Sequence, residues 1–494
     1  MLGVENMGLK TSTLTFEERC EKSINDTQMQ AALKKAQDSQ WIKREASRED
    51  MGDWEEWRKL GQEIRQHTLA HLPDYLEMFA ENVKKQGGHV LFAQTEEEAR
   101  NYVKEITLAK NAKKIVKSKS MVTTEVGLDP MFVEMGLEVI ESDLAEFILQ
   151  MDNWDEPSHI VFPNIHKDRY QIQKIFENLG YEGSSEPEEM AKFARKVLRE
   201  HFLSADIGIT GCNFAIANNG MINLVTNEGN ADLVIAIPKT QIVLMGMERI
   251  VPSMQEAEVL DSLLCRSAVG QKLTSYVTYA GRKADEESDG PEDFYVIIVD
   301  DNRSNALGTQ FQEMLQCIRC GACLNVCPVY RHIGGHGYGS IYPGPMGAVL
   351  SPILGGYEEF GDLPYASSLC GACTETCPVK IPLHNLLIAH RTVMADELKR
   401  TSKMEQFGMK MAATVTGSAP VFKFVEKVDH LGSAMMATQK EPAVENLYNH
   451  GGYLTKAPAI AKNWTDYRDL PRPPKAKDGF REWFKRHKAE QGGK

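Results

Sequence analysis

A run of cysteines recurs in this chain with a period of fifty residues. The first copy carries Cys317, Cys320, Cys323 and Cys327 and is followed by Pro328. The second copy carries Cys370, Cys373 and Cys377 and is followed by Pro378. Seven of the ten cysteines therefore lie within sixty-one positions of a 494-residue chain. Disulfide frameworks belong to small secreted domains, so this spacing indicates a metal site.

The first copy matches the spacing C-x2-C-x2-C-x3-C-P, in which the fourth cysteine binds the other of two iron–sulfur clusters. Gly321 and Gly371 let the backbone approach inorganic sulfide closely. Zinc prefers isolated sets of four ligands and fits the repeat poorly. If the last cysteine of each run binds the other cluster, which we call the crossed assignment, the sequence predicts two 4Fe-4S clusters. Cluster 1 is then on Cys317, Cys320, Cys323 and Cys377, and cluster 2 on Cys327, Cys370 and Cys373.

Cluster 2 is one thiolate short in this assignment. The repeat places Ser367 where the missing cysteine would stand. Ser367 is then a serine ligand, a neighbour of an open iron corner, or a residue unrelated to the site. Because one iron of cluster 2 would lack a thiolate ligand, we predict that this cluster converts to a 3Fe-4S form.

The remaining cysteines, Cys20, Cys212 and Cys265, are scattered and are interpreted as small apolar side chains rather than ligands. The glycine-rich segment between the two copies carries His332 and His336. It is interpreted as a connector around the clusters. The alternative makes it a docking surface whose histidines tune potential or carry protons.

Before the cysteine repeat, helical and strand patterns alternate, which favours an α/β fold. Expected helices include 96–110, 169–179 and 187–202. Expected strands are 89–93, 114–118, 138–142, 159–162, 207–217, 221–226, 233–238, 241–246 and 294–300. Asn218-Asn219-Gly220 between apolar runs predicts a hairpin, so the sheet is expected to be mixed.

Composition divides the chain into four parts. We expect an N-terminal helical arm over 1–67, an α/β domain over 68–300, a mostly helical ferredoxin-like domain over 301–395, and a helical extension with a basic tail over 396–494. Polar residues after expected strands are candidates for a ligand pocket, because open α/β sheets bind ligands at the carboxyl ends of strands. They are Lys117, Lys119, Thr123, Thr124, Glu125, His166, Lys167, Asn227, Glu228 and Asn230. None forms a recognisable nucleophile–base pair.

Four segments resemble the lactate-utilisation protein B family. They are 208–217, 224–230, 322–335 and 363–370, and the resemblance extends over most of the chain. It implies an α/β lactate-utilisation domain similar to the sugar-phosphate isomerase and CoA-transferase folds, a two-cluster segment and a helical C-terminal extension. Related domains often carry an acidic residue just before the hairpin turn. Asn218 and Asn219 stand there instead, which argues against isomerase-like catalysis.

The resemblance implies an electron-transfer subunit in the oxidation of L-lactate to pyruvate. The implied partners are a cysteine-rich iron–sulfur subunit and a second subunit with a lactate-utilisation domain. The alternative is a self-contained enzyme whose α/β domain binds a hydroxy acid or an acyl thioester. A redox-sensing regulator is disfavoured, because the net charge of −13 argues against nucleic-acid binding.

The chain is expected to be cytoplasmic, or peripheral to a membrane through its partners. No apolar run approaches the roughly 18 residues that cross a bilayer. The first twenty-two residues carry charges throughout, unlike a secretory signal.

Overall fold

The computed structural model describes residues 4, 7–436, 452–457, 462, 465, 468–471 and 480–491. The chain forms two compact units, Met1–Leu398 and Lys399–Lys494. No helix of the described residues is both long and apolar enough to cross a membrane.

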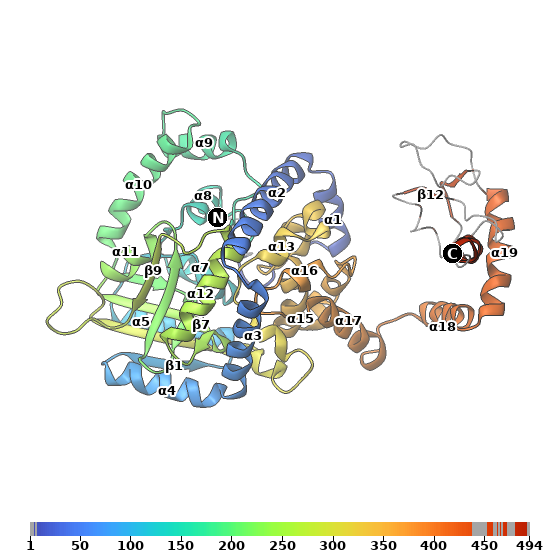
Figure 1. The fold of residues 1–494 in the computed structure, drawn as a ribbon. Coiled ribbons are helices and arrows are strands. Elements are labelled where there is room, and N and C mark those ends of the chain that lie inside the picture. Colours follow the sequence, from blue (N-terminus) through green and yellow to red (C-terminus); the bar gives the residue numbers. More distant parts are fainter. Residues whose placement is uncertain are drawn as a thin grey trace. The chain divides into compact units, whose positions relative to one another are not determined.

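A six-stranded parallel sheet organises the first unit (Figure 1). In spatial order its strands are β1 (His89–Ala93), β10 (Asp293–Val299), β7 (Thr240–Gly246), β4 (Ile207–Thr210), β2 (Lys114–Lys117) and β3 (Glu138–Glu141). Side chains on β7 alternate between two cores: Ile242 packs with helices on one face and Val243 with helices on the other. The sheet is therefore covered on both faces, as parallel sheets require.

The helices of this α/β region lie on both sides of the sheet. They are α4 (Leu72–Lys85), α5 (Glu96–Ala109), α6 (Met121–Glu125), α7 (Leu128–Glu134), α8 (Leu144–Met151), α9 (Arg169–Glu177), α10 (Pro187–Ser204), α11 (Asn230–Ala236) and α12 (Met254–Val269). Helices α5 and α7 share one core with the sheet, and α4 and α11 share another.

A second sheet of four strands contains the predicted hairpin. Its order is β8 (Ile250–Val251), β5 (Phe214–Ile216), β6 (Met221–Thr226) and β9 (Tyr276–Ala280). Strands β5 and β6 pair antiparallel across the turn at Gly220, whose φ is 71°. The expected mixed pairing is thus confirmed, in this second sheet, since β5 also pairs parallel with β8.

Three expected strands are wrong. Residues 159–162 form a loop, because the His159 ring accepts the N–H groups of Val161 and Phe162 and turns the chain. Residues 233–238 fall largely in α11, where Ala231, Val234 and Ile235 are buried at helical spacing. The run 207–217 is broken into β4 and β5, which belong to different sheets. Strands β8 and β9 were not predicted.

The cysteine repeat folds as short helices beside three N-terminal helices (Figure 1). The N-terminal helices are α1 (Phe16–Ile24), α2 (Thr27–Asp50) and α3 (Trp54–Ala70). The repeat region contains α13 (Ala322–Asn325), α14 (Pro328–Ile333), α15 (Gly344–Phe360), α16 (Ala372–Thr376) and α17 (Leu383–Thr392). Buried residues of α2, α3 and α12 share one core with the cysteines.

The second unit is helical, as expected of the C-terminal extension. Its described elements are α18 (Lys403–Gly417), α19 (Ala419–Met436), β11 (Tyr453–Leu454), β12 (Leu470–Pro471) and α20 (Phe480–Gln491). Strands β11 and β12 pair antiparallel.

One buried carboxyl predicts a pH-dependent stability. Asp261 on α12 is 1% exposed, accepts a hydrogen bond of 3.0 Å from Asn223, and has a pKa raised by burial to about 7. The folded protein therefore holds this proton to higher pH than the unfolded chain does, so this group costs stability as pH rises from about 4 to 7. Asp261→Asn removes the cost. We expect its stability advantage over the parent to grow by about 2 kcal/mol between pH 5.5 and 8.

Chemical denaturation of the cluster-loaded protein at the two pH values measures this advantage. Asp289→Asn, in an exposed loop, is the matched control. An advantage of Asp261→Asn that stays constant with pH would contradict the assignment.

Candidate metal centre

The two copies of the cysteine run adopt the same backbone conformation. Arg319 and Leu369, fifty residues apart, have φ values of 59° and 53°. Gly321 and Gly371 follow them with φ values of 74° and 81° and precede α13 and α16. Such left-handed positions are costly for non-glycine residues. Two matched pairs indicate that both copies are built to present their cysteines in the same way.

Four cysteines from both copies line one cavity. They are Cys317, Cys320 and Cys323 from the first copy and Cys377 from the second. The other wall residues are mainly apolar: Ile318, Met346, Val379, Ile381 and Leu383. The last cysteine of the second copy thus lies with the first three of the first copy.

The remaining three cysteines form a second group. The pKa of Cys327 is raised by burial and by the charge of Cys370. That of Cys373 is raised to about 11 by burial, with further contributions from Cys327 and Cys370. The charge of Cys373 also raises the pKa of Cys323, so the two groups are neighbours. Cys370 is exposed, unlike Cys327 and Cys373.

The electrostatics of the first group favour a bound cationic centre. Burial, with a smaller contribution from the charges of neighbouring thiolates, raises the pKa of Cys320 to about 12 and that of Cys377 to about 11. Four thiolates in an apolar cavity would repel one another unless cations lay between them. Metal coordination reverses the effect on the pKa values, because a thiol that coordinates a metal loses its proton. The residues therefore fit an iron–sulfur cluster.

Ser367 occupies the position of a cysteine in the second copy. Its hydroxyl oxygen accepts a hydrogen bond of 3.0 Å from the Leu369 N–H. In the first copy the Cys317 sulfur accepts from the Arg319 N–H at 3.4 Å. The two side chains therefore make the same local contact fifty residues apart.

Buried arginines bind the backbone of the cysteine loops, and no sequence motif marks them in advance. Each donates to a main-chain carbonyl of the repeat region or of the residues just before it. The bonds are Arg44 to Thr376 (2.9 Å), Arg58 to Cys377 (2.9 Å), Arg65 to Leu315 (3.0 Å) and Arg249 to Cys317 (2.8 Å). Guanidinium groups so placed fix the loops and bring positive charge close to the thiolates.

The three scattered cysteines lie outside both groups. Cys265 is buried in the core of α12, and Cys20 and Cys212 are partly buried against apolar side chains.

Several predicted pocket residues instead use their polar atoms on other side chains or on the backbone of the fold. Lys117 is fully buried and pairs with Asp129 (2.5 Å) and Glu141 (2.8 Å). Glu125 pairs with Arg303 at 2.8 Å and accepts from the Tyr342 hydroxyl. The side chains of Thr123 and Thr124 donate back to the Ser120 carbonyl. These contacts are structural.

Other predicted residues do face a cavity. Lys119, Asn227, Glu228 and Asn230 line one cavity beyond the carboxyl ends of β2, β3 and β4. Arg319 and Cys320 of the cysteine repeat line the same cavity.

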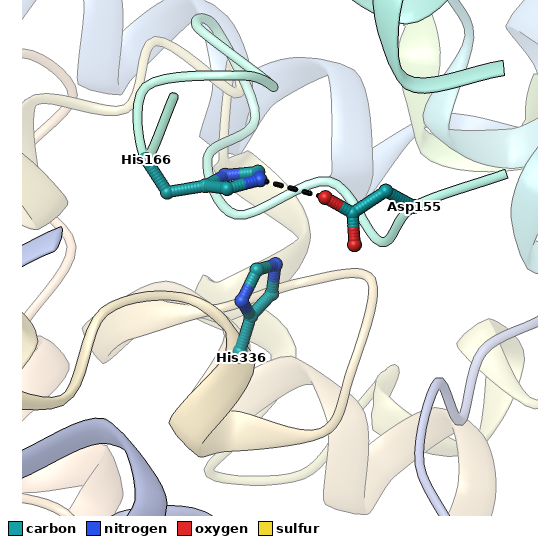
Figure 2. Close-up of side chains that lie close together, drawn as sticks. All are labelled: Asp155, His166 and His336. Atoms are coloured by element: carbon teal, nitrogen blue, oxygen red, sulfur yellow. Dashed lines mark hydrogen bonds and ion pairs between the residues drawn. The ribbon is translucent and has the colours of Figure 1, made fainter. Parts of the chain in front are cut away.

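The predicted histidines lie in two different places. His332 is exposed and contacts the Pro328 carbonyl. His166 and His336 come together with Asp155, as Figure 2 shows, with the His166 Nε2 atom 3.0 Å from the Asp155 carboxylate. One ligand atom of each lies within 4.8 Å of the others. Lys167, however, binds the same carboxylate oxygen at 2.5 Å, so a metal ion would compete with its ammonium group.

Three family models match the chain in order. They are the LUD domain over residues 76–299, the 4Fe-4S dicluster domain over 313–381, and the C-terminal domain of lactate utilisation protein B over 388–489. The chain thus belongs to the class of iron–sulfur proteins that join a LUD domain to a dicluster domain.

Curated relatives match nearly end to end. Lactate utilization protein B of Bacillus pumilus is 54% identical over 486 residues, which cover 98% of this chain and 100% of the relative. The Bacillus cytotoxicus protein of that name is 55% identical over 483 residues, 98% of this chain and 99% of the relative. This chain belongs to the lactate utilization protein B family.

A solved structure, a DUF162 family protein from Deinococcus radiodurans, matches 46% of this chain and 98% of its own. Its identity of 15% and TM-score of 0.26 are too low to support an argument about the fold.

The grouping of the cysteines predicts that two of them, four residues apart, serve different clusters. We expect Cys373→Ser to damage the second cluster and spare the first, and Cys377→Ser to do the reverse, because the latter lines the first cavity. Electron paramagnetic resonance of the dithionite-reduced variants distinguishes the clusters. Cys265→Ser, outside both groups, is the control. Loss of the same signal in both variants would refute the crossed assignment.

Proposed function

We propose that this chain is the electron-transfer subunit in the oxidation of L-lactate to pyruvate, as the names of its relatives suggest. One observation carries the proposal: seven cysteines from two copies of one motif gather in two neighbouring groups. A pair of 4Fe-4S clusters bound there would take up and release single electrons. Breaking the C–H bond of lactate is assigned to a partner subunit.

The ligand sets follow the two groups. Cluster 1 is assigned to Cys317, Cys320, Cys323 and Cys377, and cluster 2 to Cys327, Cys370 and Cys373. The matching hydrogen bonds of Ser367 and Cys317 support Ser367 as the residue at the fourth corner of cluster 2.

The proposed partners are a cysteine-rich iron–sulfur subunit and a second subunit with a LUD domain. The C-terminal unit supplies a surface for them, because α18 and α19 expose large apolar side chains. These include Met404, Phe407, Met409, Met411, Phe424 and Val428. Methionine-rich apolar surfaces adapt readily to partners.

Metal and sulfide analysis tests the proposal directly. We expect anaerobically purified protein to carry about seven to eight irons and a similar amount of acid-labile sulfide, as two such clusters require. The bound clusters should be reduced by dithionite and reoxidised by an artificial dye. Two zinc ions and no sulfide would refute the proposal.

Ser367 provides a sharper test of cluster 2. A hard oxygen ligand holds its iron less firmly than thiolate does, so mild oxidation should give a 3Fe-4S signal by electron paramagnetic resonance. Ser367→Cys should suppress this conversion and lower the potential of cluster 2, because a fourth thiolate stabilises the oxidised state. The exposed neighbour provides the control, Ser368→Cys. If the 3Fe-4S conversion were the same in both variants, Ser367 would not be the residue at the fourth corner of cluster 2.

A further inference from the structure

A cavity of about 390 Å³ lies between the α/β sheet and the first copy of the cysteine run. We call it the sheet-edge cavity. Ser118 and Lys119 follow β2, Asp143 follows β3 and Asn213 follows β4, and all four line it. These strands are neighbours in the sheet and run parallel, so their carboxyl ends meet there. Its volume falls within the ~300–1,000 Å³ range of small-molecule sites.

The opposite wall belongs to the cysteine repeat. Arg319 and Cys320 line the sheet-edge cavity, and Cys320 also lines the four-cysteine cavity described above. A molecule bound at the sheet edge would therefore lie against a residue assigned to cluster 1.

Three nitrogen donors on the walls favour an anion. The Lys119 ammonium donates to the Val161 carbonyl at 3.0 Å and lies 3.6 Å from Asp143, which leaves donor capacity. Arg319 uses one terminal nitrogen on Glu248 and lies over the Tyr342 ring, while its other terminal nitrogen is buried without a hydrogen-bond partner among the described residues. The Asn213 oxygen is taken by the Val225 N–H, so its NH2 group remains to donate.

Glu228 adds a group that exchanges a proton near neutral pH. Its carboxylate accepts the N–H of Leu144 at 3.0 Å, at the start of α8. Desolvation, followed by the nearby charge of Asp143, raises the pKa of Glu228 to about 7. Such a carboxyl can donate a hydrogen bond to a carbonyl oxygen or accept one from a hydroxyl.

Part of the wall is apolar and accommodates a short carbon chain. It is formed chiefly by Ile160, Val161, Leu224, Leu264, Ala268 and Val269. Donors for an anionic group, a carboxyl that exchanges protons and an apolar wall together suit an organic acid with an oxygen atom next to its carboxylate.

We propose that the sheet-edge cavity binds a small 2-hydroxy or 2-oxo carboxylate against the residues of cluster 1. Lys119, Arg319 and Asn213 hold the carboxylate, and Glu228 contacts the oxygen on the neighbouring carbon. The inference rests on the proposed function and places the organic acid on this chain as well as on a partner.

Binding to the anaerobically purified, cluster-loaded full-length chain tests the inference. L-lactate and pyruvate are the probes, lactamide is the uncharged control, and coenzyme A and acetyl coenzyme A represent the thioester alternative. We expect calorimetry to show binding of lactate or pyruvate and none of lactamide. The bound acid should shift the electron paramagnetic resonance signal that survives in Cys373→Ser, because Cys320 lines the cavity.

Lys119→Met should weaken binding by about tenfold or more, through loss of a charge-assisted hydrogen bond. Lys119→Arg should retain part of the affinity. Lys113→Met is the matched control, since Lys113 is exposed at the amino end of the same strand. Intact cluster spectra establish that each variant is folded.

The outcomes separate this inference from the proposed function. Clusters that fail to form, or that cannot be reduced, refute the proposed function whatever binds. Reducible clusters with no binding of either acid refute only the cavity assignment. Binding that Lys119→Met leaves unchanged, or tight binding of the thioester in place of the acids, also overturns it.

Discussion

The crowding of seven cysteine side chains in one region is the constraint on which the first unit depends. Burial raises the pKa values of five of these thiols, and the charges of neighbouring thiolates raise them too; the five are Cys320, Cys323, Cys327, Cys373 and Cys377. Such a group is stable as anions only around a cationic centre, with further positive charge outside it. The guanidinium groups of Arg44, Arg58 and Arg65 supply that charge from α2 and α3. Helices α2 and α3 are thus part of the candidate metal centre, although they carry no cysteine.

The α/β region closes the other side of the centre. A side chain on Gly335 would bring its Cβ atom to 2.0 Å from the Ser158 carbonyl oxygen, so the connector between the two cysteine runs packs directly on the loop after α8. A Cβ atom on Gly321 would lie 3.2 Å from the His159 ring in that loop. The His336–Glu156 hydrogen bond of 2.8 Å joins the same two segments. The cysteine region therefore depends on contacts from segments far away in the sequence.

Features that depend on residues close in the sequence were mostly predicted correctly. Features that depend on tertiary packing were often not. The α/β fold with its hairpin was predictable, because turn chemistry at Gly220 and the alternation of patterns are local. The short apolar run at 233–238 was mistaken for a strand, since four or five apolar residues fit either structure until tertiary packing decides. Among the pocket candidates, Lys119 and Glu228 face a cavity while Lys117 is buried in an ion group. The sequence could not distinguish them, because Lys117 is the last residue of β2 while Lys119 and Glu228 lie in loops, and tertiary packing decides which of them meets buried carboxylates and which meets the cavity.

The two cysteine groups differ in their surroundings, and this difference bears on the direction of electron flow under the proposed function. The first is enclosed by apolar side chains, and Cys320, Cys323 and Cys377 are each 7–8% exposed. In the second, Cys370 is exposed and Ser367 stands in the place of a thiolate. An added electron adds negative charge, which costs more in an apolar enclosure than near water. Under the proposed function the enclosed group beside the sheet-edge cavity is therefore the more reducing end. Under that proposal electrons would leave toward a partner at the exposed edge, where Cys370 meets solvent.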